Sequence, residues 1–162
     1  MFREMRRKNQ KLSPEDCDAI LRSATSGVLA VSGDDGYPYA VPVSFVWENS
    51  KIYFHCANTG HKLDGIGRNE KVSFCVIGSD RVIPEEYTTY FQSVILFGRA
   101  EVVTVPTEKR AALAKLAEKY SPGLEEGRNR EVEAQWERVC IVKINVEHLT
   151  GKESIELTRA RK

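Results

Sequence analysis

Two prolines inside a strand-like run constrain the fold of this chain more than any other feature. Pro38 precedes the run 39–47 and Pro42 lies within it. A proline has no backbone N–H to donate to a neighbouring strand, so this strand must lie at an edge, form a bulge, or turn its backbone toward something else. The sequence therefore predicts a sheet in which one strand keeps backbone groups that no ladder uses.

Other segments predict an antiparallel sheet around this run. Further strands are expected at 28–31, 52–56, 71–77, 91–105 and 139–146. Turn-forming residues at 33–36 and 48–51 connect neighbouring strands as hairpins. The segment 79–90 has no clear period and is predicted to be a loop. Gly98 indicates a bulge or a close approach within the long run around it.

Helical signals do not alternate regularly with the strands. The clearest helix is expected at 107–120, and Ser13 with Pro14 marks the start of another, as cap and first helical residue. Weaker signals lie at 62–69 and 124–136. This arrangement argues against a parallel sheet and predicts a mainly β fold, an antiparallel barrel or sandwich with appended helices.

Composition limits the number of domains and the classes of partner. The 162 residues are 41% hydrophobic and 29% charged, which predicts one globular domain at 1–162. A formal net charge of +1 provides no global field for nucleic acid, and no apolar run is long enough to cross a membrane. The four cysteines are scattered without metal-ligand spacing, so we expect reduced thiols in a cytoplasmic protein and no metal site.

The two ends of the chain carry weaker patterns. The segment 1–12 is basic and can contact phosphate or nucleic acid. We expect a solvated N-terminal arm instead, because the rest of the chain shows no matching basic surface. The segment 151–162 is expected to be a C-terminal tail.

Gly60, His61 and Lys62 form a candidate anion site. They lie at the start of the expected helix 62–69, where the first backbone N–H groups have no partner within the helix. Gly60 permits close approach of a ligand, Lys62 adds a full charge and His61 adds a donor. The spacings of a Walker loop and of a dinucleotide-binding loop are both missing, and a solvent-exposed turn is the alternative interpretation.

The proline-containing strand and His55 extend this candidate site. Uncommitted backbone at 37–43 can bond the edge of a heteroaromatic ring, whereas the alternative is a bulged edge strand. His55 can donate or accept a hydrogen bond near neutral pH, or it can be a structural histidine. His55 and Cys56 are adjacent in a strand and point to opposite faces, so they are not a nucleophile–base pair.

In their order and spacing, several segments resemble the flavin-binding split barrel of the pyridoxamine 5′-phosphate oxidase-like superfamily. More narrowly, they resemble its nitroimidazole-resistance (nitroimidazole reductase) branch. The segments span about residues 5–150 and are MRRK (5–8), GVLA (27–30), GYPYAVPV (36–43), IYFHCA (52–57), GHKLD (60–64), Asn69, KVSFCV (71–76) and SVILFGRA (93–100).

The resemblance implies a homodimer of six-stranded antiparallel split β-barrels with FMN bound at the interface. The residues that would contact FMN are Tyr39, Ala40, Val41, Pro42 and Val43 at the ring, His61 and Lys62 at the phosphate, and Gln92 and Ser93 on the long strand. His55 matches the histidine that the family places near the flavin, and it is the candidate catalytic residue. The basic start continues with Asn9, Gln10 and Lys11, where family members often have Asp-Arg-Glu.

The function that the resemblance implies is that of an FMN-dependent oxidoreductase. It would reduce a small-molecule electron acceptor, such as a 5-nitroimidazole-like nitroaromatic compound, by two-electron transfer. A nicotinamide donor would have to bind over the flavin, because the chain has no dinucleotide motif of its own. Three alternatives stay open: a non-enzymatic flavin-storage module, a haem-binding relative that uses His55 or His61, and a structural protein without a cofactor.

Overall fold

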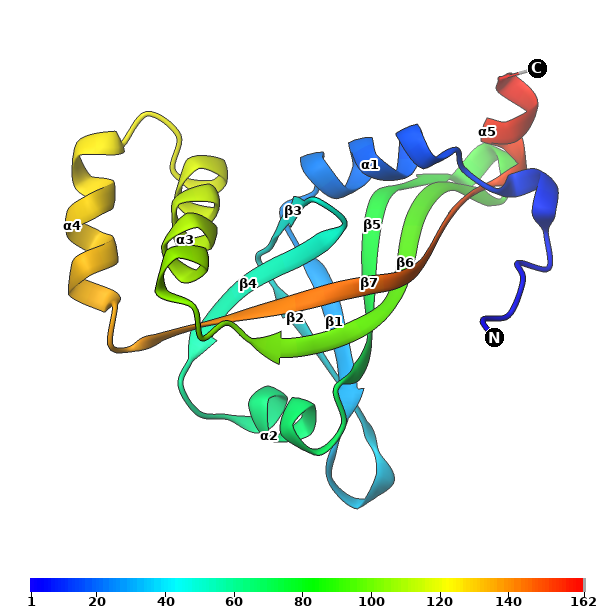
Figure 1. Ribbon diagram of the computed structural model, residues 1–162. Helices are drawn as coiled ribbons and strands as arrows, with labels where there is room; N and C mark the ends of the chain where they lie inside the picture. Colours follow the sequence, from blue (N-terminus) through cyan, green and yellow to red (C-terminus); the bar gives the residue numbers. More distant parts are fainter. Residues whose placement is uncertain (162) are drawn as a thin grey trace.

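The computed structural model describes residues 1–161, which form an antiparallel sheet with helices at its margins (Figure 1). The seven strands are β1 (Gly27–Ser32), β2 (Pro38–Val43), β3 (Val46–Glu48), β4 (Lys51–Ala57), β5 (Lys71–Ile83), β6 (Thr88–Val102) and β7 (Val139–Glu153). They are hydrogen-bonded in the order β2-β1-β5-β6-β7-β4-β3. The prediction of a mainly β, antiparallel fold is confirmed.

Helices are appended to this sheet and do not alternate with its strands. They are α1 (Pro14–Ser23), α2 (His61–Arg68), α3 (Pro106–Tyr120), α4 (Glu125–Gln135) and α5 (Ile155–Ala160). The predicted cap of α1 is confirmed, because the Ser13 hydroxyl accepts a 3.0 Å hydrogen bond from the Asp16 N–H. In Figure 1, α3 and α4 form a pair beside one end of the sheet, whereas α2 lies at another margin.

The proline-containing run forms two strands where the sequence predicts one. β2 pairs with β1 and β3 pairs with β4, so the two parts belong to opposite ends of the sheet order. Between them the Phe45 N–H donates to the Tyr120 hydroxyl at 2.8 Å, and the Phe45 carbonyl accepts from Lys119 Nζ at 3.0 Å. These bonds from α3 occupy backbone groups that a ladder would otherwise use.

This interruption explains why the sheet has seven strands where six were expected. Within residues 1–161 the ladder does not close into a ring, because β2 and β3 pair with different neighbours. Ser44 and Phe45 alone separate them, so the chain itself links the two ends of the sheet.

The prediction of a loop at 79–90 is wrong. β5 and β6 continue through this segment as a long hairpin, and a short 3₁₀ turn at Pro84–Glu86 connects them. The register of the β5–β6 pair shifts between Ile77 and Ser79. Such a bulge breaks the period of two in the sequence and thus hides the continuing strand. The expected irregularity at Gly98 is confirmed, because the β6–β7 register shifts there and an added Cβ would lie 2.3 Å from the Asn145 carbonyl oxygen.

The ends of the chain meet beside this hairpin. β7 extends to Glu153 and α5 follows, although the sequence showed only a weak pattern there. The Gln10 side-chain amide donates to the Glu153 carbonyl at 2.9 Å, and the Leu12 N–H donates to the Gly151 carbonyl at 3.0 Å. The basic arm is therefore tied to the end of β7 through its last residues.

Two apolar clusters stabilise the fold. The larger one fills the inner face of the sheet, and its fully buried side chains include Leu21, Leu29, Phe54, Phe74, Leu96 and Val142. The smaller one attaches α3 to the sheet and contains Val46, Val103, Ala112, Leu116 and Ile141. α3 therefore approaches the junction between β2 and β3 as a packed element, and this packing positions the Tyr120 hydroxyl.

We predict that Tyr120→Phe lowers the free energy of unfolding by about 1–3 kcal/mol, because backbone groups of Phe45 lose a buried partner. Urea unfolding of the two proteins measures the difference. Tyr37→Phe is the matched control, since Tyr37 is 76% exposed, and a change within about 0.5 kcal/mol is expected for it. Equal stabilities of the two variants would show that the Tyr120 hydroxyl does not support the junction.

Candidate functional site

A hollow of about 520 Å³ lies where β2, β4, α2 and β7 come together. We call it the Lys62 hollow. Its lining residues come from four separate segments: Val41, Pro42, Val43 and Ser44; His55, Cys56 and Ala57; Lys62; and Arg138 with Val139. The structure thus brings together the proline-containing strand, His55 and Lys62, which the sequence analysis selected as parts of one site.

The backbone of β2 forms one wall of the Lys62 hollow. β2 is at the end of the sheet order, so within residues 1–161 only one of its edges is paired with another strand. Val41 and Val43 are half-buried and pack against the core, whereas Ala40 and Pro42 are exposed. Tyr39 is half-buried at the other end of the strand. An edge of this kind offers backbone donors and acceptors to a ligand, as the two prolines predict.

The start of α2 forms the cationic end of the hollow. Gly60 has φ 139°, a conformation that L side chains rarely adopt, and no side chain caps the helix there. The first N–H groups of a helix carry partial positive charge and lack intrahelical partners. Lys62 is half-buried and lines the hollow directly. An anionic group would therefore meet both a full charge and helix N–H groups.

His55 and Cys56 close the hollow from the end of β4. His55 is exposed and lies opposite Ile141 of β7, whereas Cys56 is half-buried and lies opposite Cys140. Burial raises the pKa of the Cys56 thiol to about 11, although the nearby charge of Lys62 acts in the opposite direction. Cys56 is therefore a protonated thiol at neutral pH, and His55 is the more exposed of the two side chains that line the hollow.

The side chain of His61 lies outside this hollow. Its ring stacks on Tyr39 with centroids 4.0 Å apart, and its Nε2 is 3.6 Å from Asp34 Oδ2. Asp34 also bonds Arg68 at 2.7 Å, and this contact lowers the pKa of the Asp34 carboxyl. His61 thus contacts the turn between β1 and β2 with its side chain.

Gln92 and Ser93 are also remote from the Lys62 hollow of their own chain. They lie on β6 opposite Glu153 and Lys152 of β7. The Gln92 amide donates to the buried Glu153 carboxylate at 3.4 Å. Figure 1 shows this part of the β5–β6 hairpin near α5, well away from α2. The structure therefore separates the expected flavin-contacting residues into two groups within one chain.

Arg138 belongs to the site, and the sequence analysis missed it. It precedes β7 and lines the Lys62 hollow. The Asn58 side-chain amide donates to the Glu137 carbonyl at 2.8 Å and thereby ties this segment to the loop before α2. No local motif marks Arg138. Its position follows from the pairing of β4 with β7, and a prediction of that pairing would have placed Arg138 near His55.

The chemistry of the Lys62 hollow fits a planar ligand with a phosphate. Two cations line it, one of them on the first turn of α2, and an edge strand forms one wall. Among residues 1–161, no three His, Cys, Asp or Glu side chains gather closely enough to hold a metal ion. In the same part of the chain, no helix is long and apolar enough to cross a membrane.

Several solved structures share this fold, and three of them can be compared with the chain. A proposed 5-nitroimidazole antibiotic resistance protein from Bacteroides thetaiotaomicron is 22% identical, with a TM-score of 0.74 over 88% of this chain and 86% of that one. The conserved hypothetical protein Rv2991 from Mycobacterium tuberculosis is 19% identical, with a TM-score of 0.80 over 93% and 90%. The flavocytochrome Anf3 from Azotobacter vinelandii is 22% identical, with a TM-score of 0.79 over 93% and 72%.

At these identities, the structural likeness establishes a shared fold. No curated protein sequence matches the chain. The family model described as pyridoxamine 5′-phosphate oxidase, however, matches residues 13–153, which include every strand and all lining residues of the Lys62 hollow. The chain therefore belongs to the pyridoxamine 5′-phosphate oxidase family.

Proposed function

We propose that the protein is an FMN-dependent oxidoreductase that binds FMN in the Lys62 hollow and reduces nitroaromatic compounds. The observation that carries this proposal is the meeting of Lys62, Arg138, His55 and the β2 edge in one hollow. Family membership supports a flavin, and one structural neighbour is a flavocytochrome. Another neighbour is a proposed 5-nitroimidazole resistance protein, which supports the class of substrate.

The residues present fit FMN at both ends of the molecule. Lys62, Arg138 and the first N–H groups of α2 would hold the phosphate, because such groups bind a dianion with charge-assisted hydrogen bonds. The β2 backbone from Tyr39 to Val43 would bond the polar edge of the ring system. Bound FMN would supply the two-electron chemistry, and the chain would orient it and limit access of water.

His55 would act on the substrate side of the site. It is exposed at the end of β4 and lines the hollow. An imidazole at this position can donate a hydrogen bond to a nitro or carboxylate oxygen and can deliver a proton near neutral pH. A nicotinamide donor and the acceptor would react with the flavin in turn, and the reacting group of each would lie beside His55. The four free cysteines suit the reducing cytoplasm, where we propose that the protein acts.

A second copy of the chain would complete each site. The outward face of the sheet exposes the apolar side chains of Val28, Ile77, Ile95 and Phe97, which are 38–61% accessible. Val28, Cys75 and Ile95 are successive partners across β1, β5 and β6, so this apolar surface is continuous. A C2 dimer that buries it would shield apolar area and would bring Gln92 and Ser93 of one copy toward the flavin of the other.

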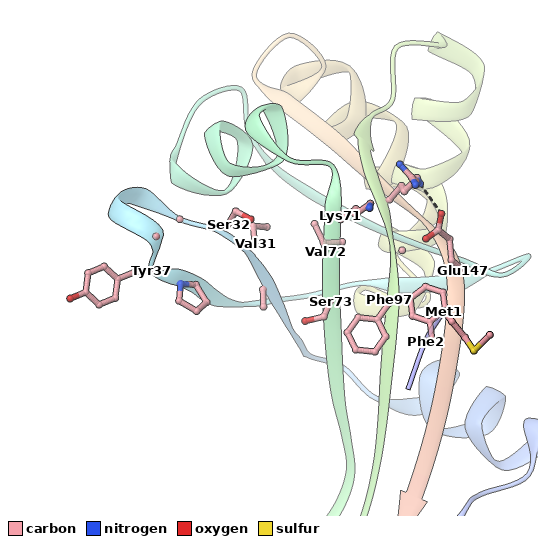
Figure 2. A pocket seen from close by; sticks show the side chains of 16 residues that line it. Met1, Phe2, Val31, Ser32, Tyr37, Lys71, Val72, Ser73, Phe97 and Glu147 are labelled. Carbon is pink, nitrogen blue, oxygen red and sulfur yellow. Dashed lines mark hydrogen bonds and ion pairs between the residues drawn. The ribbon is translucent and has the colours of Figure 1, made fainter. Parts of the chain in front are cut away.

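A further hollow, of about 650 Å³, lies on this outward face. Figure 2 shows Phe2, Phe97 and Ser73 among the side chains that line it. Of its two lining cations, Arg99 is engaged by Glu70 and Glu147, and Lys71 is exposed to water. The ring of Phe2 stacks on Phe97 with centroids 5.7 Å apart. We therefore assign this hollow to contact with the second copy and the Lys62 hollow to FMN.

The assignment of the phosphate predicts that FMN binds more tightly than riboflavin. Lys62→Ala and Arg138→Ala should each weaken FMN binding by about 1.5–3 kcal/mol and leave riboflavin binding nearly unchanged, since each removes one charge-assisted hydrogen bond. Fluorescence titration measures both affinities. Lys115→Ala and Arg130→Ala are matched controls at exposed positions of α3 and α4. Equal affinity of the unmodified protein for the two flavins would refute the phosphate site.

His55→Ala should retain the FMN content and the melting temperature, while turnover of nitroaromatic acceptors falls by about 10²-fold or more, as for loss of a general acid. Steady-state reduction, followed by absorbance of the acceptor, measures the change. If the His55→Ala variant loses both its flavin and its stability, His55 is a structural histidine. Unchanged turnover with full flavin would remove His55 from the site. An absorbance band of haem in place of that of flavin would contradict the assignment of FMN as the cofactor.

The proposed dimer predicts that Ile95→Glu yields monomers that lose FMN, because a charge replaces an apolar side chain at the centre of the outward face. Light scattering gives the mass, and absorbance gives the flavin content. Val105→Glu is the control, because Val105 is 52% exposed and lies outside this face, just before α3. A flavin-loaded monomer at micromolar concentration in the unmodified protein would contradict the dimer.

A further inference from the structure

A second hollow of about 670 Å³ lies between α3, α4 and the ends of β4 and β7. We call it the helical chamber. Its walls are largely apolar and include Leu113, Leu116, Ala117 and Val132. Helices that pack directly against each other leave no such space, because interiors are filled at close-packed density. The gap between α3 and α4 is therefore a feature that needs an explanation.

The chamber adjoins the Lys62 hollow. Ser44, His55 and Val139 line both cavities, so the two spaces meet around His55. A molecule in the helical chamber would reach His55 from one side while a flavin in the Lys62 hollow reached it from the other. This inference rests on the proposed function, because it makes the chamber the place where the electron acceptor binds.

Contacts at one end of α4 keep the chamber open. Lys109 Nζ donates to the Trp136 carbonyl at 2.7 Å and lies 4.3 Å from the centroid of its ring. Arg110 also lies over this ring and forms an ion pair with Glu133. α4 itself has no buried residue. The helix is thus attached to α3 near its C-terminal end, whereas Val132 and Arg128 of the same helix line a space that protein atoms do not fill.

One polar atom in the chamber wall has no partner. The Nε of Arg128 is buried and makes no hydrogen bond, and within residues 1–161 no ion pair engages this side chain. Glu131 also lines the chamber, but it is exposed to water and forms no ion pair with Arg128 in the same residues. Buried donors are nearly always satisfied, and a guanidinium matches the two oxygens of a carboxylate. The wall therefore lacks an acceptor that a ligand can supply.

We propose that the helical chamber binds a small aromatic carboxylic acid. Its ring would lie against Leu113, Leu116 and Ala117, and its carboxylate would accept hydrogen bonds from Arg128. The opposite end of the molecule would then lie beside His55, which is where a nitro group must be for reduction. The substrate class of the enzyme is, on this basis, nitroaromatic compounds with an acidic group remote from the nitro group.

The test compares two probes of similar shape, 4-nitrobenzoate and nitrobenzene, by equilibrium dialysis against the FMN-loaded protein. We expect 4-nitrobenzoate to bind at least ten-fold more tightly, the scale for a hydrogen bond between charged groups. Arg128→Met should abolish this preference and Arg128→Lys should restore part of it. Arg130→Met is the matched control, because Arg130 is exposed on the same helix and outside the chamber, and the preference should survive in it.

Equal binding of the two probes by the unmodified protein would overturn the proposal, as would a preference that persists in Arg128→Met. Ala117→Phe, which fills the chamber, should weaken the binding of both probes at least ten-fold. Ala111→Phe, on the exposed side of α3, should leave the binding of both unchanged. Dialysis without FMN separates this inference from the proposed function. If the protein does not bind FMN but binds 4-nitrobenzoate more tightly than nitrobenzene, the proposed function is refuted and the ligand of the chamber is supported. If the protein binds FMN but shows no preference between the probes, the chamber proposal is refuted and the proposed function stands.

Discussion

The hydrogen bonds between α3 and the backbone of Phe45 are the contacts on which the rest of the site depends. They interrupt the proline-containing run, so that β2 joins one end of the sheet and β3 the other. Without partners from α3, two buried backbone groups at this point would be left unsatisfied, at a cost of about 1–3 kcal/mol each. Because the junction is held, the free edge of β2 and the end of β4 face a common hollow.

The sequence predicted the features that arise from local chemistry. The edge position of β2 follows from its two prolines, and the first turn of α2 follows from Gly60 and Lys62. His55 lies beside both in the structure, and Cys56 lines the same hollow. The arrangement of these segments in one hollow depends on strand order, which periodicity does not give. The resemblance of spaced segments to a known family implied that they contribute to one flavin site.

The features that the sequence did not reveal all depend on distant partners. The outer half of the β5–β6 hairpin was hidden by a bulge, and the break at Phe45 requires side chains 74 and 75 residues away. Arg138 and Arg128 lie in a polar segment without a motif, and only the folded chain brings them to the cavities. His61 was expected beside Lys62, but its side chain contacts the ring of Tyr39 and the carboxylate of Asp34 and does not line the Lys62 hollow.

The one-ended attachment of α4 has a consequence for access to the interior. A helix without buried side chains contributes little apolar stabilisation, and its hydrogen bonds open at a small fraction of the global unfolding free energy. Contacts at Trp136 and Glu133 lie near its C-terminal end, so the N-terminal turns can separate from α3 first. Local unfolding of these turns provides an entrance to the cavities that leaves the sheet, and everything bound against β2, undisturbed.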